Sequence, residues 1–415
     1  MKQFVDKRLM QPSRRLQSVQ TPVIPLIAEL IRENPETISF GQGVVGYPPP
    51  ESITPELYRF FLNPENNKYQ SLSGIDSLKE LIIEKLKVEN NIIINKENRN
   101  SLMITAGGNQ AFLNVALAIL DPDDEVILPI PYYFNHEMAI IMANAKPVLV
   151  STDNNYQLDI DLIKKAITPK TRAIVTVSPN NPSGAVYSES LLKEINQLCA
   201  KYGIYHINDE AYEYFIFDNN KHFSPGSCHS AADYTISLYS MSKSYGFASW
   251  RIGWMTYPNS LEPALKKIQD TVIICPPVIS QYAALGALKA GPKFISKKLA
   301  TLNNIRSLIR SRLTELEEEK LANISPSSGA LYFLIRPKSD LSSIEYASDL
   351  VRKHKIATIP GEAFGLKQEC QLRLSFGALD TQNASEGIDR LISGIKEIYL
   401  SQSKNGRNSN LLTST

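Results

Sequence analysis

The sequence predicts an α/β fold with a mainly parallel sheet, followed by a smaller α+β region, and three observations support this prediction. From about residue 75 to 290, short β-branched runs alternate with helical patterns, an order typical of a parallel sheet covered on both faces. After about residue 290 this alternation ends. The chain has 415 residues, which exceeds the size at which one hydrophobic core stops growing.

Hydrophobic periodicity defines the elements of the first region. A helix is predicted at 76–90, because Leu78, Ile82 and Leu86 share one apolar stripe. Two further helices are predicted at 109–120 and 188–202. Five strands are predicted at 101–105, 125–129, 173–177, 204–208 and 235–239. Polar motifs follow several of these strands, which is where ligands bind in parallel sheets.

The C-terminal region has a different pattern. It predicts a long charged helix at 294–320, a strand near 330–335, a helix near 344–355 and a strand at 371–376. The Ser/Asn-rich tail, residues 401–415, lacks apolar periodicity, so we expect it to be disordered.

Composition and charge exclude several classes of protein. The net charge is only +2 and no basic stripe with interleaved aromatic residues occurs, so we expect no nucleic-acid partner. No apolar run approaches the roughly 20 residues of a membrane helix, so we expect no membrane partner. The four cysteines are scattered without a CxxC pair. They predict neither a zinc site nor disulfides and suit a reducing compartment, so we expect a cytoplasmic protein without a metal.

The most informative segment is 240–253, which reads Ser-Met-Ser-Lys-Ser-Tyr-Gly-Phe-Ala-Ser-Trp-Arg-Ile-Gly. A lysine amine bonds covalently to an aldehyde, while serine hydroxyls and a guanidinium bind a phosphate dianion. Pyridoxal 5′-phosphate (PLP) carries both an aldehyde and a phosphate. Lys243 is therefore the candidate Schiff-base residue, and the candidate phosphate ligands are Ser240, Ser242 and Arg251.

A glycine turn provides a second candidate phosphate site. Gly107, Gly108 and Asn109 follow a predicted strand and open an apolar helix. Glycines let the backbone approach an anion, and the free N–H groups of a helix N-terminus attract it.

Two charged side chains occupy predicted strands where solvation would be poor. Asp209 ends the strand at 204–208, where an unpaired charge would be costly, and a protonated pyridine nitrogen would be a suitable partner. Arg373 lies within the apolar strand at 371–376. A substrate carboxylate would pair with its guanidinium in a bidentate arrangement.

Taken in order, these motifs resemble the class I/II aminotransferases of fold type I, the aspartate aminotransferase-like family. The resemblance implies a PLP-dependent transferase with a large domain over residues 51–290, built on a mainly parallel sheet of seven-stranded type. It implies a small α+β domain formed by residues 1–50 plus 291–400. It also implies a homodimer whose subunits share their active sites.

The resemblance assigns roles to residues whose motifs are weak alone. Tyr133 would stack on the cofactor ring, while Asn181 and Tyr212 would contact its phenolic oxygen. Tyr69 resembles the tyrosine that reaches the phosphate from the partner subunit. On the substrate side, Arg373 would anchor the α-carboxylate, with further substrate contacts from Asn181, Gly43 and Tyr47.

We therefore expect an aminotransferase that moves an amino group from an L-amino acid to a 2-oxo acid. Lys243 would carry the proton as general base and acid, assisted by Asp209 and Tyr212. A PLP-dependent lyase or cyclase of the same fold, acting on a specialised amino acid, remains the alternative, because the same cofactor adduct begins all these reactions. Ser249 and the pair Val45-Gly46 depart from the family pattern, so the side-chain preference cannot be copied from relatives.

Two hypotheses from other functional classes fit the sequence less well. Gly41, Gly43 and Gly46 formally match the dinucleotide-binding fingerprint, but the following residues, Tyr-Pro-Pro-Pro at 47–50, cannot continue the helix that this motif needs. A catalytically inactive regulatory protein of the same fold would be free to lose Lys243 or Asp209, and this chain has both.

Overall fold

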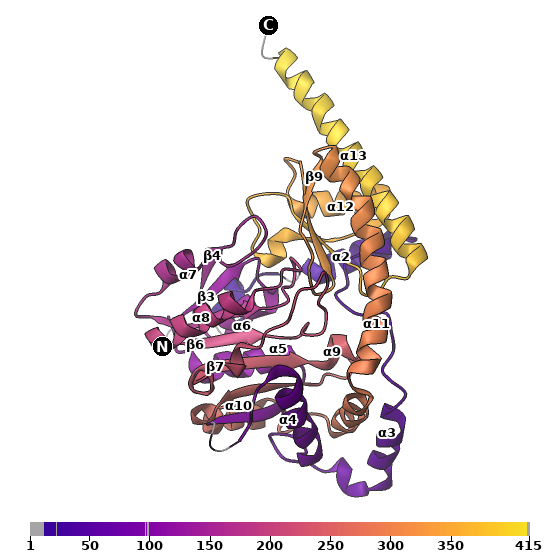
Figure 1. Cartoon of the computed structure of the whole chain (residues 1–415). Helices are drawn as coiled ribbons and strands as arrows, with labels where there is room; N and C mark the ends of the chain where they lie inside the picture. Colours follow the sequence, from indigo (N-terminus) through magenta and orange to yellow (C-terminus); the bar gives the residue numbers. More distant parts are fainter. Residues whose placement is uncertain (1–11, 22, 96, 98, 413–415) are drawn as a thin grey trace, which may run out of the picture.

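A seven-stranded sheet forms the centre of the protein (Figure 1). The computed structural model describes residues 12–21, 23–95, 97 and 99–412, with side chains up to residue 403. The strand order is β2-β8-β7-β6-β5-β3-β4. Strand β8 is antiparallel to both of its neighbours, and every other pair is parallel. The predicted α/β fold with a mainly parallel sheet is confirmed. The strands are β2 Asn100–Thr105, β3 Glu125–Ile130, β4 Lys146–Ser151, β5 Thr171–Val177, β6 Tyr205–Asp209, β7 Thr235–Ser240 and β8 Gly253–Pro258.

Helices cover both faces of this sheet because successive strand residues point to opposite sides. On β5, Val175 packs in the same apolar cluster as Phe112 of α5 and Leu265 of α10, while the adjacent Ile174 packs with Leu192 of α8. The helices of this region are α3 Ile53–Leu62, α4 Asp76–Asn90, α5 Gly108–Ile119, α6 Phe134–Met142, α7 Ile160–Ala166, α8 Glu189–Tyr202, α9 Met241–Ser244 and α10 Glu262–Ile273.

A second, four-stranded sheet is antiparallel and comes from the C-terminal part of the chain, in the order β12-β13-β10-β9. The N-terminal segment packs with this part, because β1 pairs in parallel with β11 and α2 contacts α12 and β12. The elements are α1 Arg14–Ser18, α2 Val23–Glu33, β1 Ile38–Ser39, α11 Val278–Glu318, β9 Ala322–Ile324, β10 Tyr332–Pro337, α12 Ser343–His354, β11 Ile356–Ala357, β12 Ile359–Pro360, β13 Leu372–Ser375 and α13 Thr381–Leu412.

Short 3₁₀ turns connect some of these elements. They are η2 Pro64–Asn67, η3 Pro225–Ser227, η4 Ala231–Asp233, η5 Asn259–Leu261 and η6 Gly361–Phe364. Among the described residues, no single helix is long and apolar enough to cross a membrane. The helical segments Asn259–Ile273 and Val278–Glu318 meet that criterion only when they are taken together, and they are bent by 116° relative to each other.

Two helices differ from their predictions. Helix α11 begins at Val278, well before the predicted start at 294, and is interrupted at Gly291, where φ is 61° and Pro292 follows. Proline lacks the N–H that a helix interior needs, so the sequence predicted that a helix starts just after this break. Helix α13 continues to Leu412, whereas disorder was expected from residue 401.

The extension of α13 has a physical reason. Ala384, Ile388, Leu391 and Ile395 bury one face of this helix in the C-terminal core. Once packing has nucleated a helix, each added residue gains one backbone hydrogen bond at little extra cost. Figure 1 shows the end of α13 extending away from the rest of the protein. Residues 413–415 of the predicted tail and residues 1–11 of the predicted small domain lie outside the described residues.

Candidate active site

A cavity of about 500 Å³ opens where three parallel strands end, a volume within the range of small-molecule sites. Val177, Asp209 and Ser240 are the last residues of β5, β6 and β7, and all three line it. This is the ligand-binding edge of a parallel sheet. Twelve residues singled out from the sequence line this one cavity: Gly43, Gly108, Asn109, Tyr133, Asn181, Asp209, Tyr212, Ser240, Ser242, Lys243, Arg251 and Arg373.

Lys243 lies on α9, the single turn of helix that follows β7. The Ser240 hydroxyl caps this turn by accepting a hydrogen bond from the Ser242 N–H at 3.2 Å. Burial lowers the pKa of Lys243 to about 8, with further lowering by the nearby charges of Arg373 and Arg251. A larger share of this amine is therefore neutral near pH 7 than in an ordinary lysine, and only the neutral amine attacks a carbonyl carbon.

The glycine turn and Arg251 form a candidate anion site at the N-terminus of α5. No side chain caps this helix end within the described residues, so its first N–H groups are free to bind a ligand. Gly107 has a φ of 82°, and a Cβ there would lie 2.6 Å from Nη2 of Arg251. The lack of a side chain at Gly107 thus lets the guanidinium lie against the turn. Arg251 donates only to the carbonyls of Ala248 and Ala106, so it has no anionic partner among the described residues.

Asp209 is a buried carboxylate at the end of β6. One oxygen accepts a hydrogen bond from the Ala211 N–H at 3.0 Å, and the other lies 3.1 Å from Nε2 of His136. His136 stacks on the Phe112 ring at a centroid distance of 4.0 Å, which fixes the plane of the imidazole. Sequence reasoning missed His136. The available signal was its place three residues after Tyr133, one helical turn away on α6.

Arg373 lies on β13 and is 2% exposed. Its two terminal nitrogens donate to Asn181 Oδ1 at 3.0 Å and to the Gly41 carbonyl at 2.6 Å. Its Nε has no hydrogen-bond partner among the described residues. Both acceptors are neutral, and a buried guanidinium without an anion is costly. The site therefore has the electrostatic character expected of a carboxylate-binding pocket.

The Tyr212 hydroxyl lies 2.5 Å from the hydroxyl of Tyr332, a residue that sequence reasoning also missed. Burial raises the pKa of Tyr212 well above its usual value. Both side chains line the cavity, so Tyr212 is present there as a neutral phenol that can donate a hydrogen bond.

A model of the family described as aminotransferase class I and II matches residues 35–391. The chain belongs to this family. It is 32% identical to an aromatic aminotransferase of Arabidopsis thaliana over 395 residues, covering 93% of this chain and 96% of the relative. It is also 32% identical to an aspartate aminotransferase of Pyrococcus abyssi, covering 94% of this chain and 99% of the relative.

Solved structures agree with this assignment. A Thermus thermophilus aspartate aminotransferase with maleate matches with a TM-score of 0.85 at 28% identity, covering 92% of this chain and 99% of that chain. An aromatic aminotransferase from Pyrococcus horikoshii matches with a TM-score of 0.82 at 30% identity, covering 90% and 100%. The predicted fold type and the predicted amino-group transfer are confirmed, and a lyase or cyclase is not favoured.

Three predicted residues of this aminotransferase lie elsewhere. Gly107 does not line the cavity but lies against Arg251, which does. Tyr69 is 79% exposed on the stretch before α4, away from the cavity of its own chain. Tyr47, predicted to contact substrate, does not line the cavity, because its hydroxyl donates a 2.7 Å hydrogen bond to the carbonyl of Lys243.

One wall of the cavity is apolar and was not predicted. Helix α2 contributes Ile24, Ile27, Ala28 and Ile31, and Phe134 at the start of α6 adds an aromatic ring. The spacing i, i+3, i+4, i+7 places the four helical residues on one face. This periodicity is visible in the sequence, although it does not tell which surface the face contacts.

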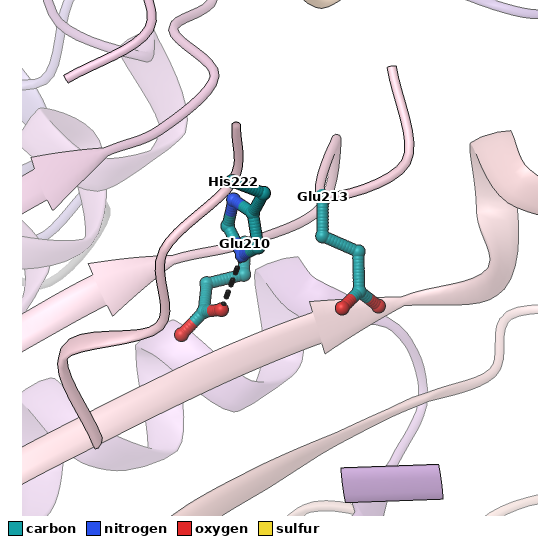
Figure 2. A group of neighbouring side chains, drawn as sticks. All are labelled: Glu210, Glu213 and His222. Atoms are coloured by element: carbon teal, nitrogen blue, oxygen red, sulfur yellow. Dashed lines mark hydrogen bonds and ion pairs between the residues drawn. The ribbon is translucent and has the colours of Figure 1, made fainter. Parts of the chain in front are cut away.

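One group of side chains among the described residues lies close enough together to bind a metal ion: Glu210, Glu213 and His222. Figure 2 shows the His222 imidazole directed at the Glu210 carboxylate, with the Glu213 carboxylate to one side. Nε2 of His222 lies 2.8 Å from Glu210, and the Lys85 amine lies 2.5 Å from Glu213. Lys85 supplies the positive charge that a metal would bring, so these side chains form an ion-pair network within the described structure.

Proposed function

We propose that this aminotransferase binds PLP in the described cavity, with the cofactor joined to the amine of Lys243. The observation that carries this proposal is a pair of arginines without anionic partners, Arg251 and Arg373, that line the same cavity as an amine whose pKa is lowered to about 8. A phosphate and a substrate carboxylate would supply the two missing anions. PLP, when bound, supplies an aldehyde that bonds to amines and a ring that withdraws electrons from the substrate Cα.

The phosphate end of the cavity fits this group. The free N–H groups at the start of α5 and the Arg251 guanidinium face one space, and the absence of a Cβ at Gly107 leaves room for that guanidinium. The hydroxyls of Ser240 and Ser242 border the same cavity and complete a donor set suited to a dianion.

The ring end fits as well. The Asp209 carboxylate would hold a proton on the pyridine nitrogen, and the Tyr212 hydroxyl and Asn181 amide would donate to the phenolic oxygen. Tyr133 would stack on the ring face. Once released by substrate, the neutral amine of Lys243 would take the proton from the substrate Cα and deliver it to C4′, the aldehyde carbon of the cofactor, which makes Lys243 the general base and acid.

Isotope transfer tests this function. We expect that purified protein supplied with PLP, ¹⁵N-labelled phenylalanine and 2-oxoglutarate will produce ¹⁵N-labelled glutamate, measured by mass spectrometry. Release of the label as ammonia would support a lyase instead. No conversion with any amino acid donor would refute the proposal.

We further propose that the amino donor has an apolar or aromatic side chain. The cationic side chains that line the cavity in the described chain are Lys243, Arg251 and Arg373, and each has a role above. None remains to pair with a second substrate carboxylate. The apolar face of α2 would instead bury a hydrocarbon side chain, which is favourable by about 25 cal/mol per Å². Relatives named aromatic aminotransferases support this preference.

Truncating Ile24 tests the substrate preference. Ile24→Ala is expected to lower kcat/KM for phenylalanine and leucine by roughly three- to tenfold, because a buried CH₂ contributes about 0.8 kcal/mol and this side chain is only partly buried. The activity with alanine, which does not reach the wall, should be unchanged. Leu26→Ala is the matched control: Leu26 is 44% exposed and Ile24 is 41% exposed, both lie on α2, and only Ile24 lines the cavity. Equal losses in both variants, or aspartate as the best donor, would contradict the preference.

We propose a homodimer with shared active sites. Helix α3 presents Tyr58, Phe61 and Leu62 to solvent, each more than 60% exposed, and Tyr69, a few residues later in the chain, is 79% exposed. Several large apolar side chains exposed on one helix are typical of a protein–protein interface. A second copy bound there would bring its Tyr69 hydroxyl toward the phosphate end of this cavity.

Tyr69→Phe is expected to raise the dissociation constant of PLP about tenfold, because one hydrogen bond to a charged phosphate is lost. Tyr58→Phe, at an exposed tyrosine on α3, should leave the dissociation constant of PLP unchanged. Equilibrium binding followed by absorbance measures both constants, and sedimentation measures the assembly. A fully active monomer would rule out the shared site.

We also propose a cytoplasmic location and keep the division into a large domain, 51–290, and a small domain, 1–50 plus 291–400. All four cysteines are free thiols, which suits a reducing compartment. Cell fractionation checks the location, and recovery of the activity in a membrane or secreted fraction would contradict it. Limited proteolysis checks the boundaries, since cleavage is expected near residues 50 and 290.

A further inference from the structure

Tyr332 lies on β10 and is fully buried, yet it lines the cavity beside Tyr212 and Arg373. Its hydroxyl makes the 2.5 Å contact with the Tyr212 hydroxyl, and its ring lies under the Arg373 guanidinium at 4.5 Å. We infer that Tyr332 is a positioning residue for both neighbours, orienting the proton of Tyr212 through its hydroxyl and the guanidinium of Arg373 through its ring. This inference rests on the proposed roles of Tyr212 and Arg373.

The chain leaves room for this arrangement at Gly43. A Cβ at Gly43 would lie 2.4 Å from the Tyr332 hydroxyl oxygen, so any side chain there would displace the hydroxyl from Tyr212. Gly43 was predicted to lie near the substrate carboxylate. In the structure, its lack of a side chain also leaves space for the Tyr332 hydroxyl.

The hydroxyl pair has a definite direction once a cofactor binds. A phenol has one proton, so a Tyr212 that donates to the phenolic oxygen of the cofactor must accept, rather than donate, in its bond with Tyr332. Tyr332 is then the donor, and within the described residues its hydroxyl has no other hydrogen-bond partner. A phenol that accepts one hydrogen bond becomes a stronger donor of the next. Tyr332 thereby strengthens the donation from Tyr212.

The ring has a separate consequence. Tyr332 and Arg373 are diagonal neighbours on one face of the antiparallel pair, because Leu334 is opposite Arg373 and Tyr332 is opposite Ser375. The guanidinium also lies 5.1 Å from the Phe364 ring. These two aromatic faces hold the fork of Arg373 by cation–π attraction while Asn181 and Gly41 accept its terminal hydrogens.

Two substitutions separate the hydroxyl from the ring. In Tyr332→Phe, weaker donation from Tyr212 leaves the negative charge on the phenolic oxygen less stabilised. The bound PLP then keeps its proton to higher pH. The midpoint of the absorbance titration of the bound PLP should therefore rise by roughly half a pH unit to one pH unit. The KM values for amino acid and 2-oxo acid should stay unchanged. Tyr332→Leu also removes the ring and should raise both KM values roughly three- to thirtyfold.

The charged and titratable groups around this pair are shared by all variants: Tyr133, Arg373, Asp209 and Lys243. Tyr257→Phe is the control, since Tyr257 is a buried tyrosine on β8 that does not line the cavity. It should shift neither the titration nor KM.

Tyr212→Phe separates failure of this inference from failure of the proposed function. A shift in Tyr212→Phe without one in Tyr332→Phe would overturn the positioning role and leave the site intact. The absence of a shift in both variants would overturn the proposed role of Tyr212 as well. A loss of melting temperature in Tyr332→Phe with an unchanged titration would assign Tyr332 a structural role only, which also overturns the inference.

Discussion

Replacing Lys243 with alanine is expected to reduce kcat for amino transfer by about a thousandfold or more. The variant loses the only lysine amine among the described residues that line the cavity, and with it the proposed general base and acid. Acid–base catalysis by one positioned side chain contributes typically about 10²–10⁴-fold. Loss of the covalent bond to the cofactor adds to this effect. Steady-state assays with saturating PLP and phenylalanine as donor measure it.

The same variant should still bind PLP, because Arg251 and the N–H groups of α5 remain in place. Equilibrium dialysis checks this retention. Lys193→Ala is the control, since Lys193 pairs with Glu189 on the exposed side of α8. If Lys243→Ala kept a tenth of the normal rate, another residue would have to carry the proton, and the assignment of Lys243 would be wrong.

Replacing Arg373 with lysine is expected to lower kcat/KM for every amino acid donor by at least about a hundredfold. Lysine keeps the charge but not the planar fork, so the two parallel hydrogen bonds to a carboxylate cannot form. Hydrogen bonds to charged groups contribute about 1.5–3 kcal/mol each, and about 1.4 kcal/mol corresponds to a factor of ten. The loss should appear mainly in KM for both amino acid and 2-oxo acid.

Arg336→Lys provides a matched control for this experiment. Arg336 lies on β10, the neighbouring strand, and pairs with Glu369 outside the cavity. Its substitution should leave kcat/KM unchanged. A comparable loss in both variants would mean that disruption of the sheet, rather than loss of a carboxylate ligand, explains the effect. An Arg373→Lys enzyme with normal KM would place the substrate carboxylate elsewhere.

Much of the sheet could be predicted because its signals are local. The strand predicted at 235–239 is β7, Thr235–Ser240, and the helix predicted at 188–202 is α8, Glu189–Tyr202. β-Branched runs and apolar periodicity lie within single elements and do not depend on distant contacts. The residues that end these strands could also be predicted to share a site, because parallel strands present their carboxyl ends at one edge.

The missing parts of the site depend on tertiary contacts. Tyr332 lies 120 residues from Tyr212 in the chain and reaches it only because the segment before β10 pairs with the segment after β6, through a bridge between Gly329 and Ile216. In the sequence it is one more aromatic residue in an apolar strand. Tyr47 was expected in the substrate pocket because of its loop, yet its hydroxyl caps the carbonyl of Lys243.

The α2 wall illustrates an intermediate case. The spacing of Ile24, Ile27, Ala28 and Ile31 predicts an apolar helix face. Only the packing of α2 against β12 and α12 turns that face toward the cavity rather than toward the core alone. The proposed substrate preference therefore rests on the structure, whereas the motifs in the sequence predicted the reaction type.

The most direct test of the account is the visible absorbance spectrum of the PLP-bound protein during addition of one amino acid at a time. We expect a yellow protein whose absorbance band is lost on addition of phenylalanine or leucine, as the cofactor takes up the amino group, and returns on addition of a 2-oxo acid. Aspartate should act more weakly. A band that no amino acid changes, or a change accompanied by release of ammonia, would contradict amino transfer at this site.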